Sequence, residues 1–183
     1  MTKILIVVDM QKDFVTGVLG TPEAQAIVPA VAARIDQAHR DAEPVYFTFD
    51  THLPDYLQTQ EGTYLPVEHC IRDTEGHGLA DGIAQACTGA DILVEKPTFG
   101  SERLAELLAN YALREGEPSG RGLQIELSGV CTDICVVSNA LLIKARLPEA
   151  KLIVQAHLCA GVTPEKHECA LEVLRSCQVE VLP

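Results

Sequence analysis

Short runs rich in valine, isoleucine and leucine recur along the chain, and the first five lack the regular apolar–polar alternation of a half-exposed strand. Strands with helices packed on both faces have this composition, because neither side of such a strand contacts water. The six predicted strands are Ile4–Val8, Pro44–Phe49, Asp91–Glu95, Leu123–Ser128, Lys151–Gln155 and Gln178–Leu182. The sequence therefore predicts a mostly parallel sheet that is buried between two layers of helices.

Helical patterns separate these strands, and two of them have recognisable starts. Ser101 is a candidate N-cap before a leucine-rich face, and Thr163 followed by Pro164 is typical of a helix N-terminus. The predicted helices are Pro29–Asp41, Leu79–Cys87, Ser101–Leu113, Thr132–Leu147 and Thr163–Cys177. This alternation predicts a three-layer α/β fold with helices on both faces of a six-stranded sheet. We expect residues 1–183 to form a single domain, because the chain is long enough for one full core.

The composition argues against several classes of partner. The formal net charge is −12, so the chain lacks the basic surface that binds nucleic acid or anionic membranes. No apolar run reaches the length of a membrane span, and the apolar start Ile4–Val8 is too short for a signal peptide. Seven cysteines without disulfide-like spacing fit a reducing compartment. We therefore expect a cytoplasmic protein, and a homo-oligomer stays open.

Polar side chains stand at the carboxyl ends of four successive predicted strands. Asp9 follows the first strand and Asp50 the second. Lys96 follows the third, and the fourth leads into Cys131 and Cys135. Parallel strands bring these ends to one edge of the sheet, where ligands bind in open α/β folds. Each residue alone fits a solvated loop, but together they predict a functional site at this edge.

Cys135 falls in the first turn of the predicted helix Thr132–Leu147. Unpaired backbone N–H groups and the helix dipole favour negative charge there, so we expect a lowered pKa for this thiol. A thiolate attacks an acyl carbon, while Asp9 can take the thiol proton and deliver it to a leaving amine. Lys96 would favour the charged forms of both groups, and backbone N–H groups near Cys131 and Cys135 would receive the oxyanion. The alternative is a buried, inert cysteine.

The segment from Thr51 to Gly78 fits neither the helical nor the strand period, and a connection of this length is usually functional or disordered. Asp50 and His52 are two apart, so an extended chain points both side chains the same way. His69 follows further along, with Glu61 between. Two histidines with one or two carboxylates suit a divalent ion, zinc first and manganese or iron next. The alternative is a surface loop that happens to hold polar residues.

Three further residues carry weaker signals. Phe14 lies close after Asp9 and is a candidate for the substrate pocket, although the core is the default place for a phenylalanine. His39 and His167 fall in helical patterns, where we expect solvated or capping side chains. No G-x-G-x-x-G fingerprint follows the first strand, so a dinucleotide cofactor is not indicated.

At these residues the chain resembles the isochorismatase-like cysteine hydrolases, the superfamily that includes nicotinamidases. The matching segments follow the family's order along nearly the whole chain and are Ile6–Phe14, Asp50–His52, Pro66–Cys70, Glu95–Phe99 and Ser128–Cys135. The resemblance implies the isochorismatase-like hydrolase fold. The implied catalytic triad is Asp9, Lys96 and Cys135. The implied metal ligands are Asp50, His52 and His69, with Glu61 as a candidate fourth ligand. A cis peptide bond between Val130 and Cys131 is implied at the oxyanion site.

The resemblance also implies a reaction, the hydrolysis of a small amide through a thioester, with nicotinamide to nicotinate plus ammonia as the leading case. Nicotinamidases typically have an aromatic residue after the metal aspartate and a tryptophan near the ring pocket. Here Thr51 follows Asp50, and the chain contains no tryptophan. Another small amide, or a carbamoyl or ureido compound, is therefore the second candidate. The remaining alternatives are the isochorismatase reaction, which does not use the cysteine, and a non-catalytic protein that binds a metal or ligand.

Overall fold

The computed structural model describes residues 1–183 and contains one six-stranded sheet, in which every neighbouring pair of strands is parallel. The strand order is β3-β2-β1-β4-β5-β6. The strands are β1 (Thr2–Val8), β2 (Val45–Asp50), β3 (Ile92–Lys96), β4 (Leu123–Val130), β5 (Lys151–Ala160) and β6 (Glu180–Leu182). Each overlaps one strand of the sequence prediction, which confirms the predicted α/β fold.

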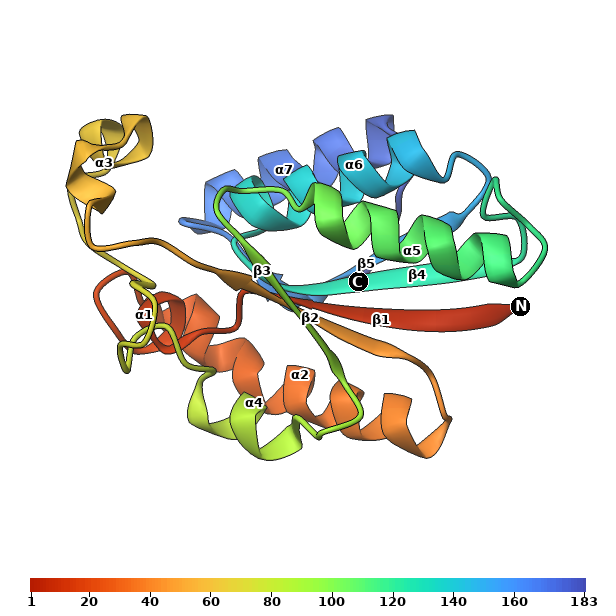
Figure 1. Cartoon of the computed structure of the whole chain (residues 1–183), viewed down its shortest axis with the longest axis horizontal. Coiled ribbons are helices and arrows are strands. Elements are labelled where there is room, and N and C mark those ends of the chain that lie inside the picture. The colour runs from red at the N-terminus through yellow and green to blue at the C-terminus, as the bar shows by residue number, and fades with distance from the viewer.

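Helices cover both faces of the sheet (Figure 1). One face carries α2 (Pro22–Arg40) and α4 (Asp81–Ala86), and the opposite face carries α5 (Glu102–Arg114), α6 (Val137–Arg146) and α7 (Pro164–Ser176). The shorter elements are α1 (Lys12–Val15), the 3₁₀ turn η1 (Tyr56–Gln58), α3 (Gln60–Tyr64) and the π-type turn η2 (Thr132–Val136). None of the helices combines the length and the apolar composition that crossing a membrane requires.

The central strand β1 explains why its sequence lacks polar alternation. Successive side chains of a strand point to opposite faces. Ile4 and Ile6 belong to the core beneath α5, α6 and α7, whereas Leu5 and Val7 belong to the core beneath α2. All four side chains are fully buried. A polar residue on either face of this strand would therefore lie in a core.

The structure differs from the predicted boundaries at two places. Helix α2 begins at Pro22 rather than at Pro29, because Thr21 caps it by accepting a hydrogen bond from Ala24 N at 3.0 Å. Pro29 lies inside this helix and does not start it. Strand β5 continues beyond Gln155 to Ala160. Its register with β4 shifts along this stretch, so its residues do not follow one regular strand pattern to the end.

The sheet has its topological switch point between β1 and β4. The connection from β1 to β2 runs through α2 on one face, and the connection from β4 to β5 runs through α6 on the other. The chain therefore leaves the carboxyl ends of these two adjacent strands in opposite directions, which opens a crevice between them. Asp9 follows β1 and Cys135 follows β4, so both residues stand at this crevice.

Gly129 sets the close approach of β1 and β4 beside the crevice. Its φ is +114°, and a Cβ atom there would lie 2.1 Å from Val8 O. We expect Gly129→Ala to lower the free energy of unfolding by about 3 kcal/mol or more, because it combines backbone strain with a clash against backbone. Gly89→Ala is the matched control, since a Cβ there meets no atom within 4 Å, and it should change stability by less than about 0.5 kcal/mol. Urea denaturation of both variants tests this, and equal midpoints would contradict it.

Candidate active site

Asp9 is placed by the end of β1 and by its neighbour strand. The residue adopts a left-handed backbone with φ of +48°, which an aspartate tolerates better than most residues. Its backbone N–H donates to Thr48 O at 3.2 Å, and Thr48 Oγ1 donates to Asp9 Oδ1 at 2.6 Å. Both residues are fully buried. The carboxylate is therefore fixed in a dry site, with Oδ2 left for another partner.

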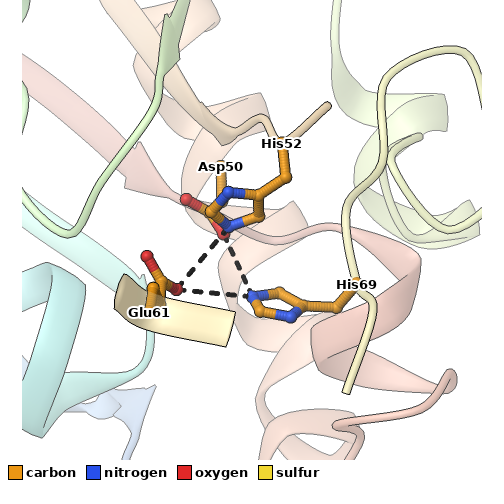
Figure 2. A group of neighbouring side chains, drawn as sticks. All are labelled: Asp50, His52, Glu61 and His69. Atoms are coloured by element: carbon orange, nitrogen blue, oxygen red, sulfur yellow. Dashed lines mark hydrogen bonds and ion pairs between the residues drawn. The ribbon is translucent and has the colours of Figure 1, made fainter. Parts of the chain in front are cut away.

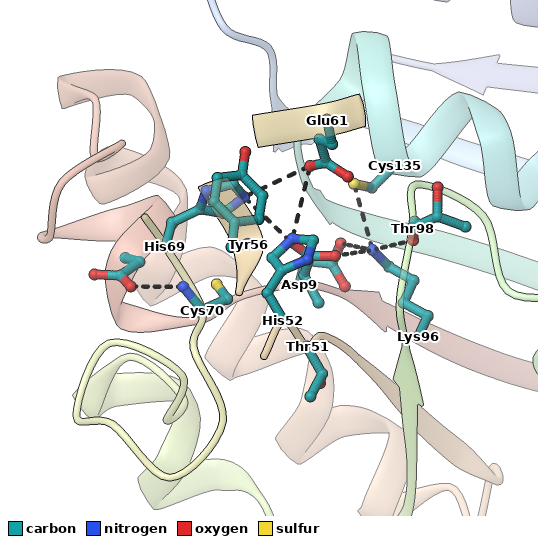
Figure 3. A network of polar contacts seen from close by, with 12 residues as sticks. Asp9, Thr51, His52, Tyr56, Glu61, His69, Cys70, Lys96, Thr98 and Cys135 are labelled. Atoms are coloured by element: carbon teal, nitrogen blue, oxygen red, sulfur yellow. Dashed lines mark hydrogen bonds and ion pairs between the residues drawn. The ribbon is translucent and has the colours of Figure 1, made fainter. Parts of the chain in front are cut away.

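That partner is Lys96, the last residue of β3 (Figure 3). Its Nζ lies 2.7 Å from Asp9 Oδ2 and 3.2 Å from Asp50 Oδ1, and it donates to Thr98 O at 3.0 Å. The fourth contact of Nζ is Cys135 Sγ at 3.6 Å. Lys96 is only 1 % exposed, so its charge depends on these contacts. The structure thus brings the aspartate, lysine and cysteine singled out from the sequence into direct contact.

Cys135 lies in η2, the turn that joins β4 to α6. Cys131 precedes this turn as its N-cap, and its carbonyl accepts hydrogen bonds from Ile134 N and Val136 N, both at 3.1 Å. The bond to Val136 spans five residues, so the turn is wider than an α-helical one. The peptide bond between Val130 and Cys131 is cis. Asn139 anchors the turn from α6, because its Nδ2 donates to Cys135 O at 2.8 Å.

The expectation of a lowered thiol pKa is wrong for this structure. Burial raises the pKa of Cys135 well above the ordinary value, and the nearby carboxylate of Asp9 raises it further, which outweighs the opposing effect of Lys96. Burial also raises the pKa of Asp9, against the opposing effect of Lys96. The sequence showed the helix start and the lysine, but the burial of Cys135, which is only 5 % exposed, dominates. The thiol therefore needs a base beside it, and Asp9 occupies that position.

A second polar cluster adjoins the first (Figure 2). His52 Nε2 lies 2.9 Å from Asp50 Oδ2, and His69 Nε2 lies 3.4 Å from the same oxygen. Glu61 Oε1 completes the group, 3.6 Å from His52 Nε2 and 3.8 Å from His69 Nε2. One ligand atom from each of the four residues lies within 4.8 Å of all the others. The structure therefore gathers all four residues that the sequence suggested as metal ligands.

The donor set fits a divalent ion in composition and in spacing. A tetrahedral zinc ion with bonds of about 2.0–2.1 Å holds its ligand atoms about 3.3 Å apart. The four contacts in this cluster range from 2.9 to 3.8 Å and so include this spacing. His69 Nδ1 is 2.8 Å from Val67 O, so the other ring nitrogen is turned into the cluster, as is usual for a histidine ligand. The rings of His52 and His69 also pack on Tyr56, with centroids 4.7 and 5.0 Å from its ring.

Asp50 belongs to both clusters, and buried Gln11 holds it in place. Gln11 Nε2 donates to Asp50 O at 2.8 Å, and Asp50 N donates to Gln11 Oε1 at 2.7 Å. Burial would raise the pKa of Asp50, but hydrogen bonds from His52 and His69 and the charge of Lys96 lower it. Sequence reasoning missed Gln11, although a polar residue two positions after Asp9 in a buried stretch was a usable signal.

Two more hydrogen bonds fasten the loop that carries the histidines. Asp13 Oδ2 accepts from Cys70 N at 2.8 Å, next to His69, and Thr51 Oγ1 lies 2.8 Å from His77 Nε2. Neither pair could be singled out from the sequence, because each joins residues far apart in the chain. His39 also differs from its expected role, since its Nε2 pairs with Asp91 at 2.8 Å.

A cavity of about 280 Å³ opens beside both clusters. Its polar floor includes Asp50, Glu61, His69 and Cys135, while most of its other lining residues are apolar. Phe14 of α1 lines it and meets His69 edge-on, with ring centroids 5.5 Å apart. Pockets that hold small ligands are typically about 300–1,000 Å³, so this cavity suits a compact molecule. Lys166 of α7 also lines it, a residue that sequence reasoning did not select.

These features define the class: a doubly wound α/β protein whose buried polar site lies at the switch point of the sheet. Within this class the match to a known family is direct. The family model described as Isochorismatase domain matches residues 3–183. The chain therefore belongs to the isochorismatase family.

Relatives with known names support the same placement. The nicotinamidase of Schizosaccharomyces pombe is 27% identical to this chain over an alignment of 209 residues. The alignment covers 97% of this chain and 91% of that protein. The structure of a nicotinamidase/pyrazinamidase from Bacillus subtilis superposes with a TM-score of 0.80 at 25% identity and covers 100% of both chains. A pyrazinamidase from Pyrococcus horikoshii, solved in complex with zinc, has a TM-score of 0.82 at 24% identity and covers 100% of this chain and 99% of that one.

We expect the purified protein to bind about one divalent ion per chain through the four-residue cluster. His52→Ala and His69→Ala should each remove that ion, because each loses an imidazole ligand, and circular dichroism should show that the fold remains. His157→Ala is the control, since His157 is an exposed residue of β5 whose Nδ1 contacts only Pro183 O. Elemental analysis and zinc titration calorimetry measure the effect. Equal zinc affinity in His69→Ala and His157→Ala would exclude the cluster as the site.

Proposed function

We propose that this protein is a cysteine amidohydrolase that cleaves a small amide through a thioester, with nicotinamide as the leading substrate. The observation that carries the proposal is the contact of one buried ammonium, Lys96 Nζ, with the Asp9 carboxylate and the Cys135 sulfur at the floor of a small pocket. A nucleophile, a base and a cation in one dry site are the parts that acyl transfer requires. Two of the named relatives are called nicotinamidases, which supports nicotinamide as the substrate.

In the first half of the reaction, Cys135 Sγ attacks the carbonyl carbon of the amide while Asp9 accepts the thiol proton. Asp9 then delivers this proton to the amide nitrogen, the C–N bond breaks, and ammonia leaves. The acyl group remains on Cys135 as a thioester. The raised pKa of the thiol makes the base necessary, because little thiolate forms without it.

In the second half, water attacks the thioester carbon while Asp9 accepts a proton from that water. The C–S bond breaks, the proton passes to the sulfur, and the carboxylic acid leaves. Lys96 keeps Asp9 oriented and balances the negative charge that moves between the carboxylate and the sulfur. Backbone N–H groups of the turn that follows Cys131 would receive the developing oxyanion.

For the metal cluster we propose zinc, held by Asp50, His52, His69 and Glu61. Two imidazoles and two carboxylates are ligands that zinc accepts, although manganese and iron share this preference. The bound ion would supply a Lewis acid beside the thiol, which can fix a substrate nitrogen or a water. Phe14 and its apolar neighbours would hold the ring of the substrate against this polar floor.

A second candidate substrate is another small amide or a ureido compound. Thr51 occupies the position after Asp50 where nicotinamidases typically have an aromatic residue, and its hydroxyl is engaged by His77 rather than turned to the pocket. An ammonia-release screen over nicotinamide, pyrazinamide and ureido compounds separates the two substrate classes. No release from any of them would favour the non-catalytic alternative.

The nucleophile has a direct test. Cys135→Ala should lower ammonia release from nicotinamide by at least about 10³-fold, because the variant lacks the sulfur that carries the acyl group in the proposed mechanism. Cys131→Ala is the matched control from the same turn, and it should keep most of the activity, since Lys96 contacts the sulfur of Cys135. Substrate should also protect Cys135 from iodoacetamide. Near-full activity in Cys135→Ala would point instead to the cysteine-independent isochorismatase reaction.

The supporting residues should act as one unit with the nucleophile. Asp9→Asn removes the proton acceptor and Lys96→Met removes the charge, so each should cost roughly 10²–10⁴-fold in kcat. The double variant Asp9→Asn/Cys135→Ser should lose little more than the more damaging single variant, because both residues serve the same step. Steady-state kinetics of the three proteins measure this. Fully additive losses would mean that Asp9 and Cys135 belong to different sites.

A further inference from the structure

One wall of the pocket is built by the short connection between β5 and α7. Gly161 and Val162 follow directly after β5 and line the pocket. Thr163 then caps α7, where its hydroxyl accepts a hydrogen bond from Lys166 N at 3.3 Å. On the thiol side the lining residues come from η2 and include Cys135. The wall and the thiol therefore belong to different elements, and the distance between them fixes the width of the pocket.

Asp133 joins these two elements directly. It lies in η2, two residues before Cys135, and its Oδ1 accepts a hydrogen bond from Val162 N at 2.9 Å. Gly161 lies against the same carboxylate, since a Cβ atom on Gly161 would be only 2.9 Å from Asp133 Oδ1. The Asp133 carboxylate therefore holds the backbone of the pocket wall at Val162. Residue 161 has to be a glycine-sized residue, because a side chain there would push against this carboxylate.

A second hydrogen bond joins the same two elements. Thr132, the first residue of η2, is fully buried, and its Oγ1 lies 2.8 Å from Nδ1 of His167 in the first turn of α7. His167 is thus neither solvated nor a cap, as its place in a helical pattern suggested. A Cβ atom on Gly161 would also lie 2.9 Å from His167 N. Gly161 is therefore packed closely against both Asp133 and His167, the two residues that make these hydrogen bonds.

We propose that Asp133 and His167 are positioning residues that set the width of the substrate pocket and thereby its selectivity for substrate size. We call their two contacts, Asp133 to Val162 and His167 to Thr132, the α7 latch. The inference rests on the proposed function, because it assigns a substrate-size limit to the same pocket. Neither residue contacts Asp9 or Lys96, so the latch acts through the position of the wall and not on the chemical step.

The small size of the pocket makes this positioning consequential. A cavity of about 280 Å³ lies at the lower end of the range for small-ligand pockets, so an outward shift of the wall changes which molecules fit. One methylene group gained or lost in an apolar pocket is worth about 10–200-fold in selectivity. A residue with a purely structural role would instead lower stability and leave the size selectivity unchanged.

Alkylation of Cys135 measures the width without requiring turnover. The readout is the rate with N-phenyl iodoacetamide divided by the rate with iodoacetamide, each followed on the Cys135 peptide by mass spectrometry. The two reagents attack the same sulfur, so its degree of ionisation cancels in the ratio. We expect Asp133→Ala and Thr132→Val each to raise this ratio about tenfold, because the wall loses one tether.

Conservative variants provide the controls. Asp133→Asn keeps an oxygen that accepts from Val162 N, and His167→Asn keeps a polar atom near the position of Nδ1, so both should stay within about twofold of the wild-type ratio. Thr132→Val and the double variant Thr132→Val/His167→Ala should give similar ratios, because they remove the same bond. The proposal would be overturned if Asp133→Ala and Thr132→Val both kept the wild-type ratio of alkylation rates. It would also be overturned if Asp133→Asn raised this ratio as much as Asp133→Ala does.

Turnover separates the latch from the proposed function. In the loss variants, kcat/KM for quinoline-3-carboxamide relative to nicotinamide should rise, mainly through KM. If the wild-type protein hydrolyses neither amide and no compound of the ammonia-release screen, the proposed function fails, while the alkylation ratio still decides on the latch. If turnover occurs and the alkylation ratio does not move, the latch fails and the proposed function stands.

Discussion

The charge of Lys96 is the interaction on which the rest of the site depends. This ammonium is enclosed by the protein, and the carboxylates of Asp9 and Asp50 balance it at 2.7 and 3.2 Å. Burial alone would lower the pKa of Lys96, but its negative neighbours raise it, so the lysine stays charged. Removal of Lys96 would leave two buried carboxylates without a compensating positive charge, which is strongly destabilising. The attraction of the ammonium for Asp9 and Asp50 therefore holds the three residues together.

Asp50 extends this electrostatic unit into the metal cluster. One of its oxygens faces Lys96 and the other faces His52 and His69, while Gln11 fixes its backbone on both sides. The cluster of Asp9, Lys96 and Cys135 and the four-residue metal-type cluster are consequently joined through one carboxylate. A small displacement of β2 would disturb both at once, which explains why so many hydrogen bonds converge on the end of this strand.

The sequence predicted the carboxyl ends of the first four strands to within two residues. A parallel sheet brings these ends to one edge whatever the details of packing. Asp9, Asp50, Lys96 and Cys135 could be selected on that ground alone. The start of α2 was missed since Pro29 imitates a first helical residue, whereas the working cap is Thr21. Gln11 and His167 were missed or misplaced because their partners lie 39 and 35 positions away in the chain. The raised pKa of Cys135 depends on its burial among residues from several elements, which local sequence does not encode.

The location of Lys96 on an edge strand has a consequence for how the protein loses function. Strand β3 is the outermost strand on its side and is bonded only to β2, and Leu93 on it is 57 % exposed. Elements with few buried contacts open at a lower free energy than the central strands of the same sheet. A transient release of β3 withdraws the ammonium from Asp9 and Cys135 while the core around β1 and β4 stays folded. Activity should thus fade under mild denaturant before the bulk secondary structure does.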